Sequence, residues 1–556
     1  MKKSFLAILC LAILLPAVGF AGGQQEEAEG TKKFTAFIGE SRPAMNPEGT
    51  IIGDKIEELT GVEIEMEYLV GDLATKAGVM LASGDMPDFI NARNEHYRFR
   101  SDGYLIPLED LITEHAPNLR KVIGDSWDSY FQPGPDGESH IFAIPDLIPY
   151  GKTVLTRPDN GWYIQSAVLE EAGWPQVETF EQYWKLIEDY KANHPTIDGE
   201  DTIGFEILAF DWYQWYVFEA AHQAMIGTLD SAYKVDKVNG KWTAKEFYFD
   251  EHVKRYFSVL NEMYRKGLIN PEGFVNNLDQ YKASLTSGRV LATYQPEWVI
   301  GDVTSYLKYE MPEKTLVALP LKWEKGDFSA YNEIRSSAVG MGTSISINCE
   351  DPVSAIKYLD TLITEEVQML GYWGIEGVDY YRDSNGRVNR TSEQNDNFAD
   401  RSNDYFYPQW GGEYYNEFWP GIDGSFSDGT TTRYGSQPEI FFQSLTEREQ
   451  QILTEMNWDT FSSAFNPPSD PRIDDKKVYS PLWNINPDTG SIEQEYIVAL
   501  TQGGVRDGMI PKMIMASSNE EFENVWASYE EAIKTLPGRE ETLLYFQAEI
   551  DKRAGQ

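Results

Sequence analysis

The stretch Leu81-Ala82-Ser83-Gly84-Asp85-Met86-Pro87-Asp88-Phe89-Ile90 decides the fold, because it ends one helix and opens one buried strand. Upstream, apolar residues recur at the spacing of a single helix face: Leu73, Ala77, Met80 and Leu81. Gly84 stops that helix, and Pro87 forces an extended entry into the strand. The stretch therefore predicts a short turn of the kind that presents side chains to a ligand.

Three further elements precede this stretch. Residues 34–38 form a candidate strand, and Ile52, Ile56 and Leu59 mark a helix face that ends at Thr60-Gly61. Residues 62–68 alternate apolar and acidic side chains, which is typical of a half-buried strand. The order β-α-β-α-β predicts a mostly parallel sheet with helices on both faces.

The N-terminus has the pattern of an export signal. Lys2 and Lys3 precede an apolar run over residues 5–18, and Gly19-Phe20-Ala21 has the form that a signal peptidase cleaves. We expect residues 1–21 to be a signal peptide and residues 22–33 a flexible leader, so the mature protein is predicted to be periplasmic or secreted. No later apolar run is long enough to span a membrane, and the mature chain is expected to be soluble.

Cysteine usage and chain length give two further expectations. Cys10 lies inside the apolar run, preceded by Leu9 rather than by a small residue, so lipid attachment there is not expected. Without the signal, Cys349 is the only cysteine, which excludes an internal disulfide. Stability must then come from a core, and 556 residues with 41% hydrophobic composition suffice for two or more lobes.

The charge balance restricts the partners. The chain carries 47 basic and 89 acidic residues, a net charge of -42 with neutral histidines. Such a surface repels nucleic acid and anionic lipid, so no nucleic-acid partner is expected. A polyanionic ligand is also disfavoured, although a local pocket can differ from the overall surface.

Segments after residue 81 follow an order that is known from one protein family. They are Ala82-Ser83-Gly84-Asp85 with Pro87-Asp88, residues 103–112, Ala116-Pro117-Asn118, Asp136-Gly137 with residues 141–145, residues 169–175 and 179–181, Asp351-Pro352 and residues 372–380. Together they resemble extracellular solute-binding protein family 1, the substrate-binding proteins of ABC importers. Residues 374–380, Gly-Ile-Glu-Gly-Val-Asp-Tyr, are similar to an element of its LipO/YtcQ-type branch.

The resemblance implies an α/β protein with the two-lobed periplasmic-binding-protein type II fold. Each lobe would be a mostly parallel sheet flanked by helices, and the chain would cross the hinge more than once. We expect an N-terminal lobe from residues 34–155 plus 325–378 and a C-terminal lobe from residues 156–324 plus 379–556. The implied function is to bind a small-molecule ligand by hinge closure and to deliver it, as a monomer, to ABC transporter permease subunits.

Aromatic residues predict that this ligand is an oligosaccharide. They make up 13% of the chain, with 15 Trp and 32 Tyr, and flat rings stack on the C–H faces of sugars. The candidate stacking residues are Trp298, Trp212, Trp215, Trp410 and Trp373. Trp298 follows a predicted strand and resembles the stacking aromatic of maltose-binding relatives, whereas the three-residue spacing of Trp212 and Trp215 suits one helix face and also suits core packing.

Polar candidates come from loops that follow predicted strands. Arg93 and Glu95 lie just past the strand at Phe89, and Glu40 and Arg42 lie past the first strand. Glu297 precedes Trp298. Their carboxylates and guanidinium groups could hydrogen-bond sugar hydroxyls, although exposed charges of this kind also occur in solvated loops.

Alternative functions are a peptide-binding or other solute-binding protein of the same fold, or a secreted carbohydrate-active enzyme. The enzyme interpretation is weak, because abundant carboxylates guarantee chance pairs and no His-Glu-x-x-His, Gly-x-Ser-x-Gly or phosphate-loop motif occurs. The six histidines show no metal-ligand spacing, and residues 193–201 have too few alternating oxygen ligands for calcium. We therefore expect no catalytic residues, no metal site and no cofactor.

Overall fold

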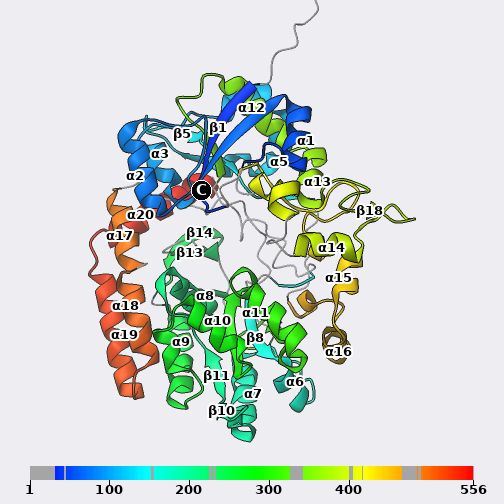
Figure 1. The fold of residues 1–556 in the computed structure, drawn as a ribbon. Helices are drawn as coiled ribbons and strands as arrows, with labels where there is room; N and C mark the ends of the chain where they lie inside the picture. The colour runs from blue at the N-terminus through cyan, green and yellow to red at the C-terminus, as the bar shows by residue number, and fades with distance from the viewer. Residues whose placement is uncertain are drawn as a thin grey trace, which may run out of the picture.

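The computed structural model describes residues 32–42, 46–151, 156–158, 160–223, 228–229, 233–248, 250–325, 342–399, 405–415, 418–465, 485, 487, 490–501 and 503–554. These residues form two α/β lobes, placed one above the other in Figure 1. Each lobe encloses its own buried apolar clusters. The two-lobed α/β fold expected from the sequence is therefore confirmed.

The sheet of the N-terminal lobe has the order β2-β1-β3-β17-β6. Strands β1 (Lys32–Ile38), β2 (Val62–Tyr68) and β3 (Phe89–Asn91) are parallel. Strand β17 (Gly342–Ile345) runs antiparallel to both β3 and β6 (Ile144–Pro145). The chain thus adds a strand from far downstream to a sheet that it began at its N-terminal end.

Local signals explain why the first elements form. Helix α1 (Ile51–Thr60) ends at Gly61 with φ 66°, and α2 (Leu73–Ser83) ends at Gly84 with φ 70°, a left-handed conformation that glycine adopts without strain. Asp88 then accepts hydrogen bonds from the backbone N–H and the hydroxyl of Thr35, at 2.8 and 2.9 Å, which ties the entry of β3 to β1. The predicted β-α-β-α-β order is confirmed.

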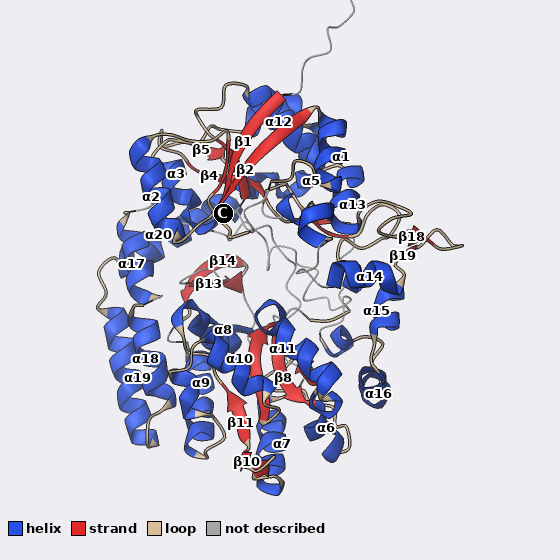
Figure 2. Ribbon diagram, viewed as in Figure 1, coloured by secondary structure: helices blue, strands red, loops and turns tan. Residues whose placement is uncertain are grey.

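Helices cover both faces of this sheet, as Figure 2 shows. The further elements of the lobe are η1 (Arg93–Glu95), α3 (His96–Ser101), α4 (Glu109–His115), α5 (Pro117–Ile123), η2 (Gly124–Tyr130), β4 (Phe131–Pro133), β5 (Ser139–Ile141), β7 (Ile148–Tyr150), α12 (Pro352–Leu362), α13 (Glu365–Trp373), β18 (Tyr381–Arg382), β19 (Val388–Asn389), α14 (Ser392–Ala399), η7 (Phe406–Trp410), η8 (Gly412–Tyr415), β20 (Ile422–Gly424), η9 (Tyr434–Ser436) and α15 (Pro438–Ser444).

The sheet of the C-terminal lobe has the order β11-β15-β8-β16. Strands β11 (Ile203–Glu206) and β15 (Val290–Pro296) are parallel, and β8 (Asn160–Gln165) runs antiparallel to β15 and to β16 (Leu316–Leu319). Three of the four strands therefore run in one direction. Every residue of β15 is buried, which is what a strand covered on both faces requires.

The remaining elements of the C-terminal lobe surround this sheet. They are α6 (Ser166–Glu171), α7 (Phe180–Asn193), β9 (Thr196–Ile197), β10 (Glu200–Asp201), η3 (Asp211–Tyr213), α8 (Gln214–Gln223), β12 (Thr228–Leu229), β13 (Tyr233–Val238), β14 (Lys241–Glu246), α9 (Glu251–Arg265), η4 (Pro271–Phe274), α10 (Leu278–Thr286), α11 (Glu297–Glu310), η5 (Pro312–Lys314), α16 (Glu447–Met456), η10 (Phe461–Ala464), α17 (Ile492–Leu500), α18 (Val505–Ile514), α19 (Asn519–Lys534) and α20 (Arg539–Ala554).

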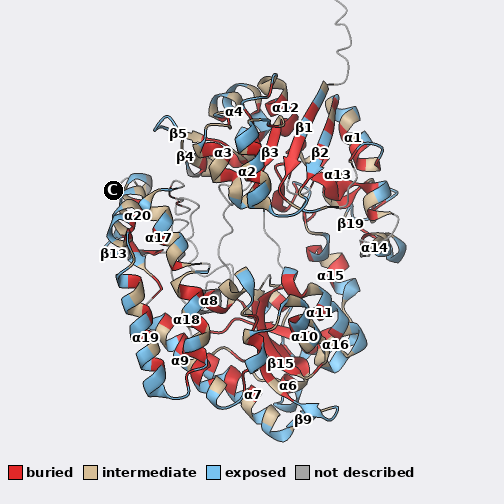
Figure 3. Cartoon of the chain, turned by 60° about the vertical axis from the view of Figure 1, so that its left-hand side comes forward, coloured by how far each residue is buried: buried red, intermediate tan, exposed pale blue. Residues whose placement is uncertain are grey.

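The chain passes between the lobes more than once. It passes from β7 to β8, and later from α15 into α16, and a further passage lies between β16 and β17 because these strands belong to different lobes. Figure 3 shows the buried residues gathered within each lobe separately. Two separately packed lobes joined by several chain passages are the arrangement expected of a hinged protein.

One expected lobe boundary is wrong. The sequence placed residues 379–556 in the C-terminal lobe, but apolar residues from Val388 to Ile440 pack in the core of the N-terminal lobe with Phe34 and Ile64. Phe441 instead belongs to the core of the C-terminal lobe, so the chain changes lobes at α15. The described aromatic residues between Tyr405 and Trp419 pack in this core with residues of the first strands and helices.

Candidate functional site

The strand directions define two inner faces, by which we mean the ends of the lobes that lie toward each other. The carboxyl ends of β1 and β3 point toward the C-terminal lobe, and those of β11 and β15 point toward the N-terminal lobe (Figure 1). Loops at the carboxyl ends of strands carry ligand sites in open α/β sheets. The residues that follow these four strands are therefore the candidates for a site.

The inner face of the C-terminal lobe carries an aromatic platform, formed by Trp298, Trp212, Tyr213 and Tyr216. Trp298 lies in the first turn of α11, directly after β15, and 64% of it is exposed. Its ring stacks on Trp212 at a centroid distance of 5.8 Å and an interplanar angle of 12°. Tyr216 meets Trp298 edge-on at 5.9 Å, and Tyr213 stacks on Trp212 at 4.0 Å.

The backbone positions this platform. Strand β11 ends at Glu206, and the chain then turns through Asp211, whose φ is 49°, before the short helix η3 presents Trp212. A non-glycine residue in the left-handed region carries strain, which surrounding structure must hold. Phe210, next to it, is 42% exposed. The structure thus leaves Trp298 and Phe210 exposed where the lobes face each other, while Trp212, Tyr213 and Tyr216 are half-buried. An exposed aromatic surface of this kind is a candidate binding site.

The inner face of the N-terminal lobe carries a polar triad, formed by Glu40, Arg93 and Asp146. Arg93 Nη1 lies 3.0 Å from Asp146 Oδ2, and Arg93 Nε lies 3.5 Å from Glu40 Oε1. The three residues follow β1, β3 and β6, so the sheet order brings them together. Arg93 has φ 50°, and its N–H bonds the side-chain oxygen of Asn91 at 3.2 Å, which holds the strained turn.

Asp146 is the member of the triad that the sequence interpretation missed. Burial raises the pKa of its carboxyl group, an effect that the neighbouring Arg93 opposes and Glu40 reinforces. The backbone carbonyl of Asp146 accepts a hydrogen bond from the N–H of Gly421 at 3.2 Å. Gly421 lies 275 residues further along the chain. The only local signal for Asp146 was its position after the short strand at Ile144-Pro145.

Two of the polar candidates have other partners. The carboxylate of Glu95 accepts a hydrogen bond at 2.9 Å from Arg98, three residues further along in the adjoining helix α3. Arg42 lies 3.7 Å from Glu413 of η8, and its side chain is largely buried. Neither side chain is part of the triad, so both rank below Glu40 and Arg93 as candidates for ligand contact.

Two tryptophan candidates lie in the core of the N-terminal lobe. Trp373 is fully buried and donates its indole N–H to the carbonyl of Thr431 at 2.8 Å. Trp410 is 4% exposed, and its ring packs against Phe398 and Phe406, each at 5.0 Å. These contacts correct the expectation that the two rings are stacking surfaces, because neither offers a free face.

Trp215 is also placed differently from Trp212. The helix α8 begins between them, at Gln214, so they do not share one helix face. Trp215 packs against the core of the C-terminal lobe, with Phe218 at 5.9 Å and the Arg506 guanidinium 5.0 Å from its ring. Of the pair, Trp212 alone belongs to the aromatic platform.

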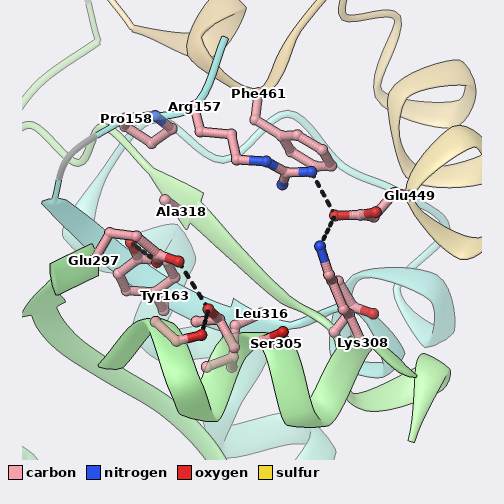
Figure 4. Close-up of a pocket in the computed structure, with 13 residues that line it drawn as sticks. Arg157, Pro158, Tyr163, Glu297, Ser305, Lys308, Leu316, Ala318, Glu449 and Phe461 are labelled. Atoms are coloured by element: carbon pink, nitrogen blue, oxygen red, sulfur yellow. Dashed lines mark hydrogen bonds and ion pairs between the residues drawn. The ribbon is translucent and has the colours of Figure 1, made fainter. Parts of the chain in front are cut away.

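Glu297 lines a pocket rather than the platform. Figure 4 shows this pocket, of 240 Å³, between α11, β16 and α16. The Glu297 carboxylate accepts hydrogen bonds from Thr304 at 2.8 Å and from Tyr163 at 3.2 Å, and burial raises its pKa. On the opposite wall, Glu449 pairs with Arg157 at 2.7 Å and with Lys308 at 3.9 Å. The side chains on these walls are thus already engaged with one another.

Two further findings concern the described part of the chain. Its side chains include no group of three or more His, Cys, Asp and Glu that could hold a metal ion. None of its helices combines the length and the apolar character that a membrane crossing requires. The predicted signal peptide and most of the leader lie outside the described residues.

Comparison with known proteins identifies the class. Residues 52–377 match the family model of the bacterial extracellular solute-binding proteins. This match covers more than half of the chain, and the chain belongs to that family. It is accordingly a solute-binding protein and not an enzyme, while the narrower LipO/YtcQ-type branch stays a prediction.

Individual relatives agree with the family. The chain is 28% identical over 290 residues to the fructooligosaccharide ABC transporter substrate-binding protein FusA of Streptococcus pneumoniae serotype 4 (strain ATCC BAA-334 / TIGR4), covering 50% of this chain and 52% of FusA. The chain thus matches about half the length of this curated relative.

Solved structures extend the likeness to nearly the whole chain. An extracellular solute-binding protein from Bifidobacterium longum subsp. infantis has a TM-score of 0.65 at 16% identity, covering 95% of this chain and 99% of that one. FusA of S. pneumoniae in complex with kestose has a TM-score of 0.63 at 16% identity, covering 94% and 100%. At these identities the likeness shows the two-lobed fold.

Proposed function

We propose that this protein is the extracytoplasmic substrate-binding component of an ABC importer and that it binds an oligosaccharide between its inner faces. The exposed stack of Trp298 on Trp212 carries the proposal, because it offers a flat apolar surface of sugar-ring size opposite a polar triad. The described relative FusA is a fructooligosaccharide-binding protein of an ABC transporter, which supports the ligand class.

The proposed mechanism is hinge closure. A sugar ring stacks on the aromatic platform, and its hydroxyls bond the triad, where Arg93 donates and the carboxylates of Glu40 and Asp146 accept. Both sets of contacts exist together only when the lobes approach, so binding free energy shifts the protein toward the closed form. A membrane permease would then recognise that form. In this proposal the protein is exported by residues 1–21 and acts as a monomer.

The test is calorimetric titration of the full chain and of Trp298→Ala with kestose. Loss of the exposed ring should weaken binding more than tenfold, which corresponds to at least about 1.4 kcal/mol, without lowering the melting temperature. Tyr309→Ala is the matched control, because Tyr309 lies on the same helix and is 59% exposed but sits at its far end.

The results separate the alternatives. Equal affinity of Trp298→Ala and the unmodified chain would remove the platform from the site. Binding of short peptides without any sugar would keep the solute-binding fold and replace the ligand class, because aromatic surfaces also accommodate peptide groups.

A further inference from the structure

The charges of the polar triad do not cancel. One guanidinium group, that of Arg93, faces two carboxylates, at 3.0 Å from Asp146 and 3.5 Å from Glu40. The side chains are 25%, 15% and 38% exposed respectively, so the group is partly withdrawn from solvent. Partial burial strengthens charge interactions relative to bulk water. A ligand group near Arg93 therefore meets a net negative charge.

Neighbouring arginines of the N-terminal lobe are engaged in the same way. Arg433 Nε lies 3.0 Å from Asp423 Oδ1, and Asp423 belongs to β20, next to the segment that anchors Asp146. Arg42 lies 3.7 Å from Glu413. Each of these arginines near the inner face has a carboxylate partner, so none stands as an isolated cation. The local balance has the same sign as the overall charge of -42.

We infer that this triad makes the protein selective for neutral oligosaccharides over those with carboxylate groups. The inference rests on the proposed function and adds a specificity determinant to it. Each carboxylate has a second oxygen besides the one paired with Arg93, and it can accept a bond from a sugar hydroxyl. A uronic acid would add a third carboxylate around the single guanidinium group of Arg93, and the two carboxylates of the triad would repel it. The positive charge of Arg93 is therefore offset by its two carboxylate partners, so Arg93 donates hydrogen bonds to sugar hydroxyls and does not bind an anionic group.

The experiment compares two trisaccharides, neutral kestose and linear trigalacturonate, by calorimetric titration of the full chain at low ionic strength. The variants are Glu40→Gln, Asp146→Asn and the double variant. Both replacements keep an oxygen that Arg93 can bond while removing the charge. Glu63→Gln is the matched control, because Glu63 pairs with Lys33 at 2.6 Å on the same sheet but at the start of β2, away from the inner face.

The unmodified chain should bind kestose at least tenfold more tightly than trigalacturonate. The ratio of the affinity for kestose to the affinity for trigalacturonate should fall at least tenfold in the double variant and by a smaller factor in each single variant. In Glu63→Gln this ratio should be unchanged. Added salt should also narrow the ratio in the unmodified chain, because screening weakens repulsion between partly exposed charges. The single variants keep the test valid if the double variant melts early.

Two results would overturn the inference while leaving the proposed function intact. One is tight binding of trigalacturonate by the unmodified chain, at or above its affinity for kestose. The other is a folded double variant whose preference is unaltered. Failure of the unmodified chain to bind either sugar would overturn the proposed function, and the inference with it.

Discussion

At the residue scale, Glu206 is a buried carboxyl group at the end of a strand of the C-terminal lobe. It ends β11, four residues before the exposed Phe210, and it is fully buried. The Asn270 amide donates to both its oxygens at 3.1 and 2.8 Å, and the Ser284 hydroxyl donates at 2.7 Å. Burial raises its pKa to about 7, although these hydrogen bonds act in the opposite direction.

This raised pKa predicts a pH dependence of stability. At pH values between 4.5, the ordinary pKa of glutamate, and about 7, the folded state holds the proton of Glu206 more tightly than the unfolded state does. The free energy of unfolding contributed by Glu206 is therefore highest below pH 4.5 and falls as the pH rises to about 7. Glu206→Gln should remove this slope and be more stable than the unmodified chain above pH 7, by on the order of 2 kcal/mol.

Urea unfolding at several pH values measures this effect. The exposed Glu310, at the end of α11, provides the control substitution Glu310→Gln, which should retain the slope of the unmodified chain. Identical pH profiles for the Glu206→Gln variant and the unmodified chain would show that the carboxyl group is not held in its buried, protonation-favouring environment.

At the element scale, helix α2 has one glycine in its interior and a second glycine directly after its last residue, and the two have opposite roles. Gly84 ends the helix at φ 70°, where an added Cβ is strained whatever the space around it. Gly78 lies in the helix interior, where an added Cβ would make only an ordinary contact with Arg98 at 3.5 Å. The same substitution should therefore change stability in opposite directions six residues apart.

The prediction is that Gly84→Ala lowers the free energy of unfolding by about 1 kcal/mol, because the Cβ of alanine strains the left-handed backbone conformation. Gly78→Ala should raise it by about 0.5 to 1 kcal/mol, because alanine is the better helix former. Chemical denaturation of the two variants and of the unmodified chain measures the direction of each change in the free energy of unfolding. Destabilisation by both would mean that the interior of α2 has no room for a methyl group.

At the scale of the whole molecule, one ion pair connects two of the passages between lobes. Arg157 lies just before β8, where the chain enters the C-terminal lobe, and Glu449 lies in the first turn of α16, where it enters again (Figure 4). Glu449 is 1% exposed, and the Arg157 guanidinium also packs over the ring of Phe461 at 4.6 Å. The pair fixes the two entering segments to each other.

Glu449→Gln should lower the free energy of unfolding by about 2 kcal/mol, because it leaves Arg157 and Lys308 without their shared carboxylate in a pocket. The glutamine keeps the hydrogen bond to the backbone N–H of Thr446 that caps the helix. Thermal unfolding measures the change, and Glu447→Gln is the control, since Glu447 is an exposed residue of the same turn. Equal stability of the two variants would mean that the pair contributes nothing to the hinge region.

Several features could be predicted because their causes lie close together in the sequence. The alternation of residues 62–68 predicts β2, and Gly61 and Gly84 predict the ends of α1 and α2. The residues Asp383-Ser384-Asn385-Gly386 are typical of a hairpin turn, and this segment joins β18 to β19. Placing Trp298 after a strand also located the exposed ring, since the order of strand and helix is local information.

Other features depended on packing between distant segments. Trp373 and Trp410 have the same chemistry as Trp298, and only the elements packed around them decide that they are buried. Asp146 joins Arg93 because β6 lies in the same sheet, two positions from β3 through β17, a strand nearly 200 residues later. No pattern around Asp146 carries that information.

The sequence by itself determined the class of fold, the order of the first strands and helices, and the kind of residue that a sugar site requires. These follow from hydrophobic period, glycine and proline conformations, and composition, which act over a few residues. Tertiary structure alone decided which aromatic rings remain exposed, which carboxylates surround Arg93, and that the described residues between Val388 and Ile440 pack in the N-terminal lobe. Burial and charge pairing depend on segments that meet only when the chain has folded.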